Sequence, residues 1–147
     1  MEFLIFIFGV ILDRVTKIWA LNKLYSGEEI VVIKDFFSFS YLENRGAAFG
    51  ILQNKIIFLV IITLIVILGI LYFLIKYKPK SKVLRISLAL IISGAIGNLI
   101  DRVFYNFVVD FILLHYKDIY YYPTFNVADM LVVVGTTLLA IYLIKED

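Results

Sequence analysis

Twenty consecutive residues, 56–75, carry no charged side chain, and this run constrains the fold more than any other feature. A backbone inside hydrocarbon must satisfy its own hydrogen bonds, so an apolar run of this length predicts a membrane-spanning α-helix. Small residues are sparse in the run, which predicts that much of the helix faces lipid. Hydrophobic residues make up 63% of the 147-residue chain and charged residues 18%, which indicates an integral membrane protein.

Three further segments, at about 3–21, 86–103 and 127–144, have the length and apolarity of membrane spans. The first is expected to be retained, because no basic residue precedes it and no signal-peptide cleavage pattern follows it. The loop 76–85 holds five basic residues and no acid, which places it in the cytoplasm by the positive-inside rule. We therefore expect 1–147 to be one integral membrane domain. Its fold class is a mainly α four-transmembrane-helix bundle with both termini in the cytoplasm.

The segment 22–55 is the first substantial polar region. Its β-branched and aromatic stretches at 30–33 and 36–42 predict two or more short strands, and a glycine-punctuated turn follows at 44–50. We expect a small extracytoplasmic β-rich cradle that lies on the bilayer. The outer loop 104–124 is rich in Tyr and Phe, which is typical of a membrane interface.

Cysteine is absent from the chain, and His115 is the one histidine. A disulfide framework, thiol catalysis and metal sites built from several Cys or His ligands are therefore excluded. The net charge of +2 is too small to suggest a nucleic-acid partner. We expect no metal and no cofactor.

Three carboxylates, Asp101, Asp110 and Asp129, lie in or beside the apolar segments, where an ionised group is costly and therefore suggests function. Asp101 lies sixteen residues after Arg85, and Asp129 lies sixteen residues before Lys145. At about 1.5 Å per helical residue, both acids lie roughly 24 Å from the cytoplasmic border. In hydrocarbon about 30 Å thick, the two antiparallel helices present them at one level, just below the outer surface.

One ridge of the third apolar segment is built from small residues and an acid. Ala89, Ser93, Gly97 and Asp101 recur every four residues, so they share a helix face. This pattern predicts a close helix–helix contact that ends in a polar site. Asn98 lies one turn before Asp101 and is either its hydrogen-bond partner or an amide at a helix contact.

The fourth apolar segment begins at a second acid. Asp129 shares a helix face with Thr136 and Ala140, and this small or polar face predicts that the carboxylate points into the bundle. Asn126 fits an N-cap three residues earlier, which places Asp129 near the positive end of the helix. Capping and catalysis are compatible, because a helix N-terminus favours the ionised form that a base needs.

Asp110 lies nine residues beyond Asp101, which on a straight helix is half a turn out of phase. Asn106 tolerates the left-handed conformation, so the chain can turn there. Residues 108–111 can then return in extended form with Asp110 at the mouth of the bundle. From these residues alone, either Asp101 or Asp110 can pair with Asp129.

Paired carboxylates resist joint ionisation, so they can share a proton near neutral pH. The ionised member can activate water while the protonated member donates to a carbonyl oxygen, which is the aspartic protease arrangement. A site just under the outer surface favours a membrane-tethered peptide as substrate. One alternative is a small membrane transporter or proton or cation relay that uses the same carboxylates, although no acid lies at the midplane. Another is a non-catalytic adaptor, which leaves three inward acids unexplained.

Polar and aromatic residues elsewhere favour structural interpretations. Asp13 and Lys17 are four residues apart, which predicts an intrahelical ion pair with Lys17 reaching to the membrane interface. Trp19 is expected to anchor the chain at an interface, and His115 is expected at the surface or interface.

Five blocks of the chain resemble bacterial lipoprotein signal peptidase, the signal peptidase II family. In order they are 13–17 (DRVTK), 44–50 (NRGAAFG), 93–102 (SGAIGNLIDR), 108–111 (VVDF) and 125–129 (FNVAD). Each block is weak alone, but five in order over nearly the whole length, with four apolar segments between them, are specific.

The resemblance implies an aspartyl endopeptidase of the bacterial cytoplasmic membrane that cleaves prolipoproteins before the diacylglyceryl-modified lipobox cysteine. It implies that Asp110 and Asp129 are the catalytic dyad, with an active site near the outer face. The supporting residues it implies are Asp13, Lys17, Asn44, Gly46, Asn98, Asp101, Arg102 and Asn126. Membrane lipid and globomycin-type inhibitors are implied as further partners. The chain departs from the family at Ser93, where Gly is usual, and at Arg14, where Gln is common. Neither departure is expected to affect more than packing.

Overall fold

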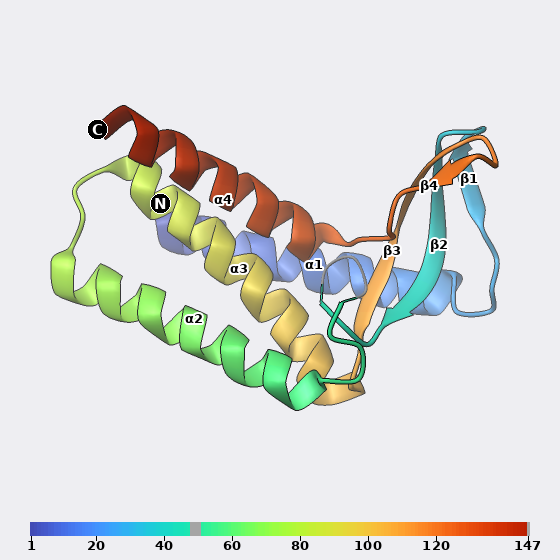
Figure 1. Ribbon diagram of the computed structural model, residues 1–147, viewed down its shortest axis with the longest axis horizontal. Helices are drawn as coiled ribbons and strands as arrows, with labels where there is room; N and C mark the ends of the chain where they lie inside the picture. The colour runs from blue at the N-terminus through green and yellow to red at the C-terminus, as the bar shows by residue number, and fades with distance from the viewer. Residues whose placement is uncertain (48–50, 147) are drawn as a thin grey trace.

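The computed structural model describes residues 1–47 and 51–146. Residues 48–50, the end of the turn expected at 44–50, lie outside them. The elements are α1 (Glu2–Lys23), β1 (Ile30–Ile33), β2 (Phe37–Asn44), α2 (Ile56–Tyr77), α3 (Lys82–Tyr105), β3 (Val108–Tyr116), β4 (Tyr120–Tyr121) and α4 (Val127–Glu146). The long helices lie side by side, the sheet covers one end of them, and both termini lie near the opposite end (Figure 1).

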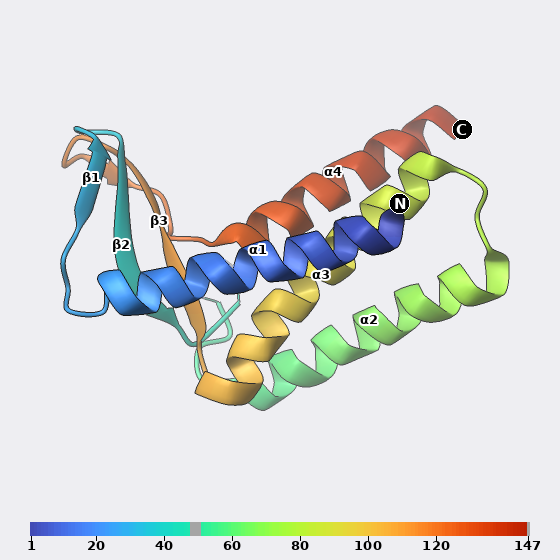
Figure 2. The same ribbon diagram turned by 180° about the vertical axis from the view of Figure 1, so that it is seen from behind.

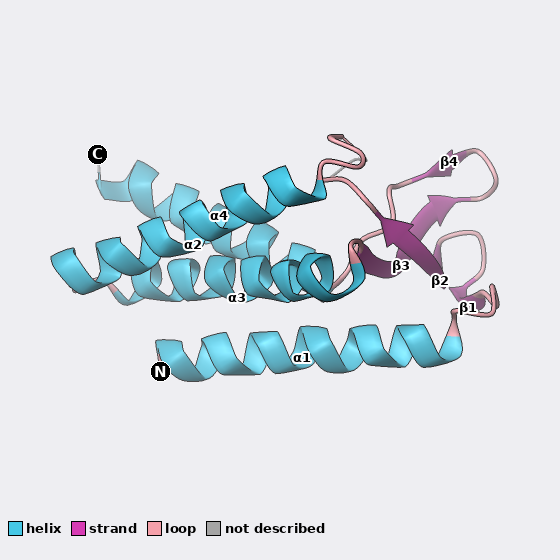
Figure 3. Cartoon of the chain, turned by 90° about the horizontal axis from the view of Figure 1, so that it is seen from below, coloured by secondary structure: helices cyan, strands magenta, loops and turns pink. Residues whose placement is uncertain are grey.

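α3 is the central helix, because α1, α2 and α4 all pack against it (Figures 1 and 2). The ridge Ala89, Ser93, Gly97 and Asp101 is buried along its length, so the predicted close contact is confirmed. It faces α1, which runs beside α3 (Figure 3). The Ser93 hydroxyl donates to the carbonyl oxygen of Phe6 at 3.2 Å.

A second set of small residues brings α4 against α3. A Cβ atom at Gly94 would overlap the carbonyl oxygen of Ala128, and one at Gly135 would lie 2.8 Å from the carbonyl oxygen of Ser87. Inside lipid, such close backbone approach replaces the hydrophobic effect as the source of helix association. The α3–α4 contact thereby places the start of α4, which carries Asp129, beside α3.

The predicted orientation of the α4 face is wrong beyond its first turn. Thr136 and Ala140 are exposed, whereas Ala128 and Gly135 are buried. The buried face of α4 is the one whose small residues allow α3 to pack closely. It is not the face that Asp129 shares with Thr136 and Ala140. Asp129 itself is half-buried at the helix start.

Within the described residues, three helices are long and apolar enough to cross a membrane: α2, α3 and the α4 segment Val127–Lys145. Leu59 and Ile67 are the buried residues of α2, so the prediction that much of it is uncovered is confirmed. α1 carries charged residues in its middle and is not among these three. The chain is thus mainly helical with three candidate membrane helices and a small antiparallel sheet.

The sheet combines both polar segments of the chain. The predicted strands are present as β1 and β2, and β3 and β4 complete the antiparallel order β1-β2-β3-β4. The turn predicted at Asn106 is confirmed, since this residue is left-handed (φ 61°) and ends α3. In the pairing of β2 with β3, Asn44 lies opposite Val108 and Leu42 lies opposite Asp110.

β3 packs one of its faces against α1. Val109 and Phe111 are buried with Ala20 and Leu24, and Trp19 packs edge-on against Phe111 with ring centroids 6.1 Å apart. Because side chains alternate along a strand, Asp110 points to the opposite side. This core fixes the strand so that its acid faces the start of α4.

Candidate active site

Asp110 is 1% exposed and accepts hydrogen bonds at both carboxyl oxygens. Asn44 Nδ2 donates to Oδ2 at 3.0 Å, and Asn126 Nδ2 donates to Oδ1 at 2.6 Å. Burial, followed by the negative charge of Asp129, raises the pKa of Asp110 to about 7, while the two amide hydrogen bonds oppose the rise. The carboxyl group can therefore hold or release a proton near neutral pH.

Asp129 lies in the first turn of α4 and forms a reciprocal cap with Asn126. Its Oδ2 accepts from the Asn126 backbone N–H at 3.2 Å, and its own backbone N–H donates to Asn126 Oδ1 at 3.0 Å. Asn98 Nδ2 donates to Asp129 Oδ1 at 2.8 Å. The predicted capping role is confirmed, and both oxygens of the carboxylate meet N–H donors, which suits the anion.

Asn126 joins the two acids through one buried amide group. Its Nδ2 contacts Asp110, its Oδ1 contacts the backbone of Asp129, and Nδ2 also lies 3.2 Å from Asn98 Oδ1. The fold thus brings together residues from β2, β3, α3 and α4 that the sequence resemblance assigned to one site: Asn44, Asp110, Asn98, Asn126 and Asp129.

Asp101 is fully buried but has different partners. Arg14 Nη1 donates to Oδ1 at 2.7 Å, and Lys17 Nζ forms an ion pair with Oδ2 at 3.0 Å. The Val109 N–H also donates to Oδ2 at 3.0 Å, which ties the start of β3 to the end of α3. Asn98, considered as a partner of Asp101, instead donates to Asp129.

Lys17 lies at the centre of a buried charge cluster. Its side chain is 0% exposed, with Nζ 3.0 Å from Asp13 Oδ2 and 2.9 Å from Asn98 Oδ1. The contact between Lys17 and Asp13 has the distance of an ion pair, but its geometry is not that of a hydrogen bond. The predicted ion pair is confirmed, but the expectation that Lys17 reaches to the interface is wrong. Asp13 and Asp101 compensate its charge, so the ammonium group remains inside.

Asp13 also reaches the last helix. Its Oδ1 accepts from the Ala128 N–H at 2.9 Å, so an acid of α1 caps the N-terminus of α4. A Cβ atom at Gly97 would lie only 2.5 Å from Asp13 Oδ2. Glycine at this position of α3 therefore leaves room for the carboxylate that connects α1 with α4.

Arg102 holds the turn that follows β2. Its Nη2 donates to the carbonyl oxygen of Gly46 at 3.0 Å, and the Gly46 N–H donates to Asn44 Oδ1 at 2.9 Å. A Cβ atom at Gly46 would lie 2.5 Å from the carbonyl oxygen of Ile51, so glycine fits the crowded turn. These contacts orient Asn44 toward Asp110.

Sequence reasoning underestimated Arg14, which it treated as a packing difference. The guanidinium forms the 2.7 Å ion pair with Asp101 and lies 6.0 Å from the centroid of the Tyr105 ring. Its position three residues before Lys17, on the helix that carries Asp13, was the available signal. Two cations so placed on an apolar helix need buried carboxylates as partners.

The described part of the chain, 1–47 and 51–146, contains no group of three or more His, Cys, Asp or Glu side chains placed to hold a metal ion. What the site does contain is a pair of acids, one buried with a raised pKa and one at a helix N-terminus, joined through an asparagine amide. This arrangement can supply a proton donor and a proton acceptor to the same reacting group.

A family model described as "Signal peptidase (SPase) II" matches residues 5–145. This chain belongs to the signal peptidase II family. It is 64% identical over 146 residues to a lipoprotein signal peptidase of Clostridium novyi, covering 99% of each chain. It is 63% identical over 147 residues to a lipoprotein signal peptidase of Clostridium tetani, covering 100% of this chain and 94% of that one.

Solved structures agree with this assignment at the level of the whole fold. A bacterial membrane enzyme determined by the in meso method at 1.9 Å resolution is 38% identical, with a TM-score of 0.86. The match covers 99% of this chain and 94% of that chain. As a signal peptidase II, the protein is a membrane protease with lipoprotein signal peptidase function. The transporter alternative is not favoured.

Proposed function

We propose that this signal peptidase II cleaves its substrate by an aspartyl mechanism in which Asp110 and Asp129 are the catalytic residues. The observation that carries the proposal is the single buried amide of Asn126, which binds both acids. Asp101 has no need of such a partner, because Arg14 and Lys17 compensate its charge. Asp101 is therefore assigned a supporting role that holds β3 beside α3.

The two acids divide the chemistry according to their surroundings. Asp129, whose oxygens meet N–H donors at a helix N-terminus, takes a proton from a water molecule. The water oxygen attacks the carbonyl carbon of the scissile peptide bond, while Asp110 donates its proton to the carbonyl oxygen. The carbon–nitrogen bond then breaks as the carbon–oxygen double bond re-forms. The proton held by Asp129 passes to the departing amine, and the proton on the former carbonyl oxygen returns to Asp110. One carboxyl group and one carboxylate are present before and after the cycle.

Other residues position these two. Asn98 and Asn126 orient Asp129, and Asn44 orients Asp110 through its amide. Farther from the acids, two groups hold these amides in place. Lys17 binds the oxygen of Asn98, and Arg102 holds the Gly46 turn. Asp13 fixes the start of α4. None of these supporting residues needs to touch the scissile bond.

α1 is proposed as a fourth membrane span. Its charged residues Asp13 and Lys17 are fully buried, whereas large apolar residues cover its outer surface. These exposed residues include Phe3, Leu4, Phe8, Ile11 and Val15. With four spans, the basic loop after α2 and both termini lie in the cytoplasm, and the sheet and the acids lie at the outer face. The sheet then serves as an extracytoplasmic cradle for the substrate.

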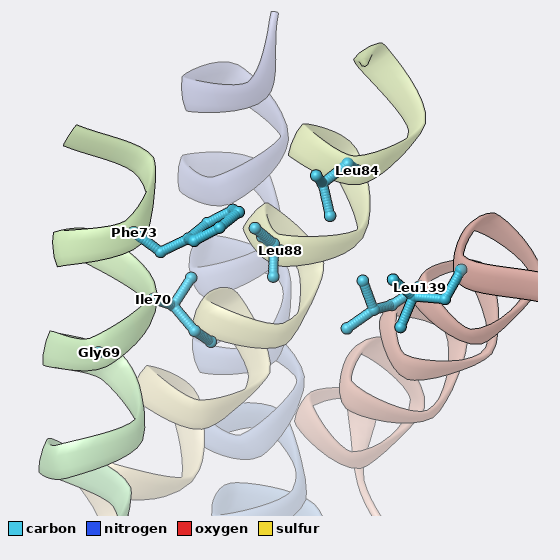
Figure 4. A pocket seen from close by; sticks show the side chains of 7 residues that line it. Gly69, Ile70, Phe73, Leu84, Leu88 and Leu139 are labelled. Atoms are coloured by element: carbon cyan, nitrogen blue, oxygen red, sulfur yellow. The ribbon is translucent and has the colours of Figure 1, made fainter. Parts of the chain in front are cut away.

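The proposed substrate is a diacylglyceryl-modified prolipoprotein, cleaved before the lipobox cysteine. An apolar cleft of about 300 Å³ lies where α2 and α4 flank α3, away from the acids (Figure 4). Its lining includes Ile70 and Phe73 of α2, Leu88 of α3 and Leu139 of α4. We propose that the apolar segment of the signal peptide passes over this side of α3, and that globomycin-type inhibitors occupy the catalytic end of the same path.

A cleavage assay with purified enzyme and a diacylglyceryl-modified prolipoprotein tests the dyad. Asp110→Asn and Asp129→Asn should each reduce the rate to background while the circular dichroism spectrum and the melting temperature show a folded protein. Asp101→Asn should retain measurable cleavage after correction for its lower stability. Cleavage by Asp110→Asn together with a dead but folded Asp101→Asn would transfer the catalytic role to Asp101.

Two further measurements test the reaction class. Excess chelator should leave the cleavage rate unchanged, because the oxygens of Asp110 and Asp129 accept from N–H groups of asparagine. A loss of rate in chelator would require a metal ion in the mechanism. Proton or cation flux in liposomes without a peptide product would instead support the transporter alternative.

A further inference from the structure

A second apolar groove, of about 610 Å³, lies on the other side of α3, between α1 and α2. Ile92 and Ile96 of α3 form its floor, Phe6 of α1 forms one wall, and Leu71 and Leu74 of α2 form the other. Its lining includes Glu2 and Arg85, near the N-terminal ends of α1 and α3. The N-terminus lies at the end of the molecule far from the sheet (Figure 2). The volume of the groove lies within the range of about 300–1,000 Å³ that is typical of small-molecule sites.

The open end of this groove carries positive charge. Lys78 and Arg85 line the rim with Glu2, and the remaining basic residues of the loop between α2 and α3 lie close in sequence. Arg85 Nε lies 3.0 Å from Glu2 Oε1, so the ion pair holds the guanidinium beside the groove. Within residues 1–47 and 51–146, Lys78 Nζ has no acidic partner.

We propose that this groove binds one anionic phospholipid of the leaflet that borders the basic loop. The acyl chains lie over Ile92 and Ile96, and the phosphate lies between Lys78 and Arg85. A groove of this kind in a membrane protein faces hydrocarbon, so an acyl chain fits its apolar floor without leaving any polar group unpaired. The phosphate supplies negative charge that this end of the groove lacks, because the single charge of Glu2 is shared between Arg85 and the Met1 ammonium group.

The groove is separate from the proposed catalytic site and from the apolar cleft assigned to the signal peptide. Its α1 lining ends at Phe6, whereas the charge cluster beside the acids begins at Asp13. The cleft of Figure 4 is lined by α2, α3 and α4 and includes no residue of α1. The lipid site therefore does not depend on which acids are catalytic. The proposed membrane topology of the protein is used only to identify the bordering leaflet as the cytoplasmic one.

Native mass spectrometry of the intact chain tests the proposal. The detergent-solubilised protein is mixed with equal amounts of dioleoyl phosphatidylglycerol and dioleoyl phosphatidylcholine, and the bound lipids are counted. We expect one phosphatidylglycerol to be retained in preference to phosphatidylcholine. Lys78→Gln should lower its affinity about fivefold, and Lys78→Gln with Arg85→Gln should lower it further. Lys145→Gln, a basic residue at the end of α4 and outside the groove, should leave the affinity unchanged.

A variant of the apolar wall separates the groove from its charged rim. Leu74→Trp narrows the groove and should reduce retention of phosphatidylglycerol while prolipoprotein cleavage stays at the wild-type rate. Equal binding of the two lipids by the wild type, or equal losses in Lys78→Gln and Lys145→Gln, would show diffuse charge attraction and overturn the proposal. A raised KM for prolipoprotein in Leu74→Trp with unchanged lipid retention would assign the groove to the signal peptide. A dimer lost in this variant would assign it to a second copy of the chain.

Lys78→Gln keeps the test decisive if Arg85→Gln fails to fold, because Lys78 makes no ion pair within the described chain. Its melting temperature should equal that of the wild type in detergent alone. Added phosphatidylglycerol should raise the melting temperature of the wild type more than that of Lys78→Gln. Equal increases in both proteins would contradict a phosphate contact at Lys78.

Discussion

Lys17 can donate hydrogen bonds but cannot accept them, and this property orients the amide of Asn98. Because Oδ1 of Asn98 must face the ammonium group, Nδ2 must face Asp129. Asn126 is oriented in the same way: the backbone N–H of Asp129 requires Oδ1, which leaves Nδ2 for Asp110. A buried cation and one backbone N–H thus determine which amide groups meet the two acids.

Replacing Lys17 with methionine should be severely destabilising. The substitution leaves Asp13 buried without a cation and removes one of the two cations that pair with Asp101. Breaking such a buried ion pair typically costs about 3–5 kcal/mol of stability. Thermal unfolding in detergent measures the loss. Thr16→Ala is the matched control on the neighbouring position, because Thr16 bonds only carbonyl groups of its own helix. Equal melting temperatures for Lys17→Met and Thr16→Ala would contradict the role of the cluster.

The pH dependence of cleavage should follow Asp110. Its pKa of about 7 predicts that kcat/KM falls as pH rises above about 7, because the carboxyl group loses the proton that it donates. Asn44 lowers this pKa through its hydrogen bond, so Asn44→Ala should shift the alkaline limb to higher pH. A pH–rate profile of both proteins measures the limb. A shift to lower pH, or none, would contradict the assignment of Asp110 as the proton donor.

The same carboxyl group should make stability depend on pH. Its pKa is raised from 3.8 to about 7 on folding, so the native state binds more protons than the unfolded state between these values. The free energy of unfolding should therefore decrease as pH rises from about 4 to about 7. Asp110→Asn should flatten this dependence and raise the melting temperature above pH 7. A melting temperature below that of the wild type at pH 8 would show that burial of this acid is not destabilising.

At the scale of elements, the glycines of α3 determine how closely α1 and α4 approach. Local patterns in the sequence were sufficient for the long helices, for β1 and β2, and for the turn at Asn106. They failed for the face of α4, because backbone contact at Gly94 and Gly135, rather than the phase of Asp129, decides which side is covered. They also left Asp101 and Asp110 undecided, because the pairing of β2 with β3 joins residues far apart in the chain.

Gly94→Ala should reduce cleavage by about 10- to 100-fold. The added methyl group would overlap the carbonyl oxygen of Ala128 and push the start of α4, with Asp129, away from Asn98. Small displacements of a catalytic group commonly cost this much. Thr137→Ala is the control, because this exposed residue of α4 lies outside both grooves and its hydroxyl donates to the carbonyl oxygen of Val133 in the same helix. Single-turnover cleavage rates compare the two. Wild-type rates in Gly94→Ala would mean that the α3–α4 contact does not position the acid.

At the scale of the molecule, the charge cluster supports the proposal that α1 is a membrane span although it carries Asp13, Arg14 and Lys17. Asp13 and Lys17 are directed inward and compensated, and the exposed surface of the helix is apolar. A hydropathy average cannot distinguish such a helix from a polar one, because it ignores which side a charge faces. The proposed fourth span therefore depends on tertiary contacts between α1 and α3.

The absence of cysteine makes the proposed topology directly testable. A single cysteine at Asp118, between β3 and β4, should react with a membrane-impermeant maleimide in intact cells. A cysteine at Lys80, in the loop between α2 and α3, should react only after the membrane is permeabilised. Equal labelling of Asp118→Cys and Lys80→Cys in intact cells, with cell integrity confirmed, would contradict the proposal that the two positions lie on opposite sides of the membrane.

The hydrogen bond from Ala128 to Asp13 closes the site across 115 residues of sequence. Asp13 is synthesised 115 residues before Ala128, so a nascent chain that ends before α4 lacks the contact that holds the helix start carrying Asp129. The proposed site is therefore complete only after α4 has packed beside α1 and α3. A nascent chain without α4 therefore cannot cleave by the proposed mechanism, because it lacks Asp129 and the backbone N–H that Asp13 binds.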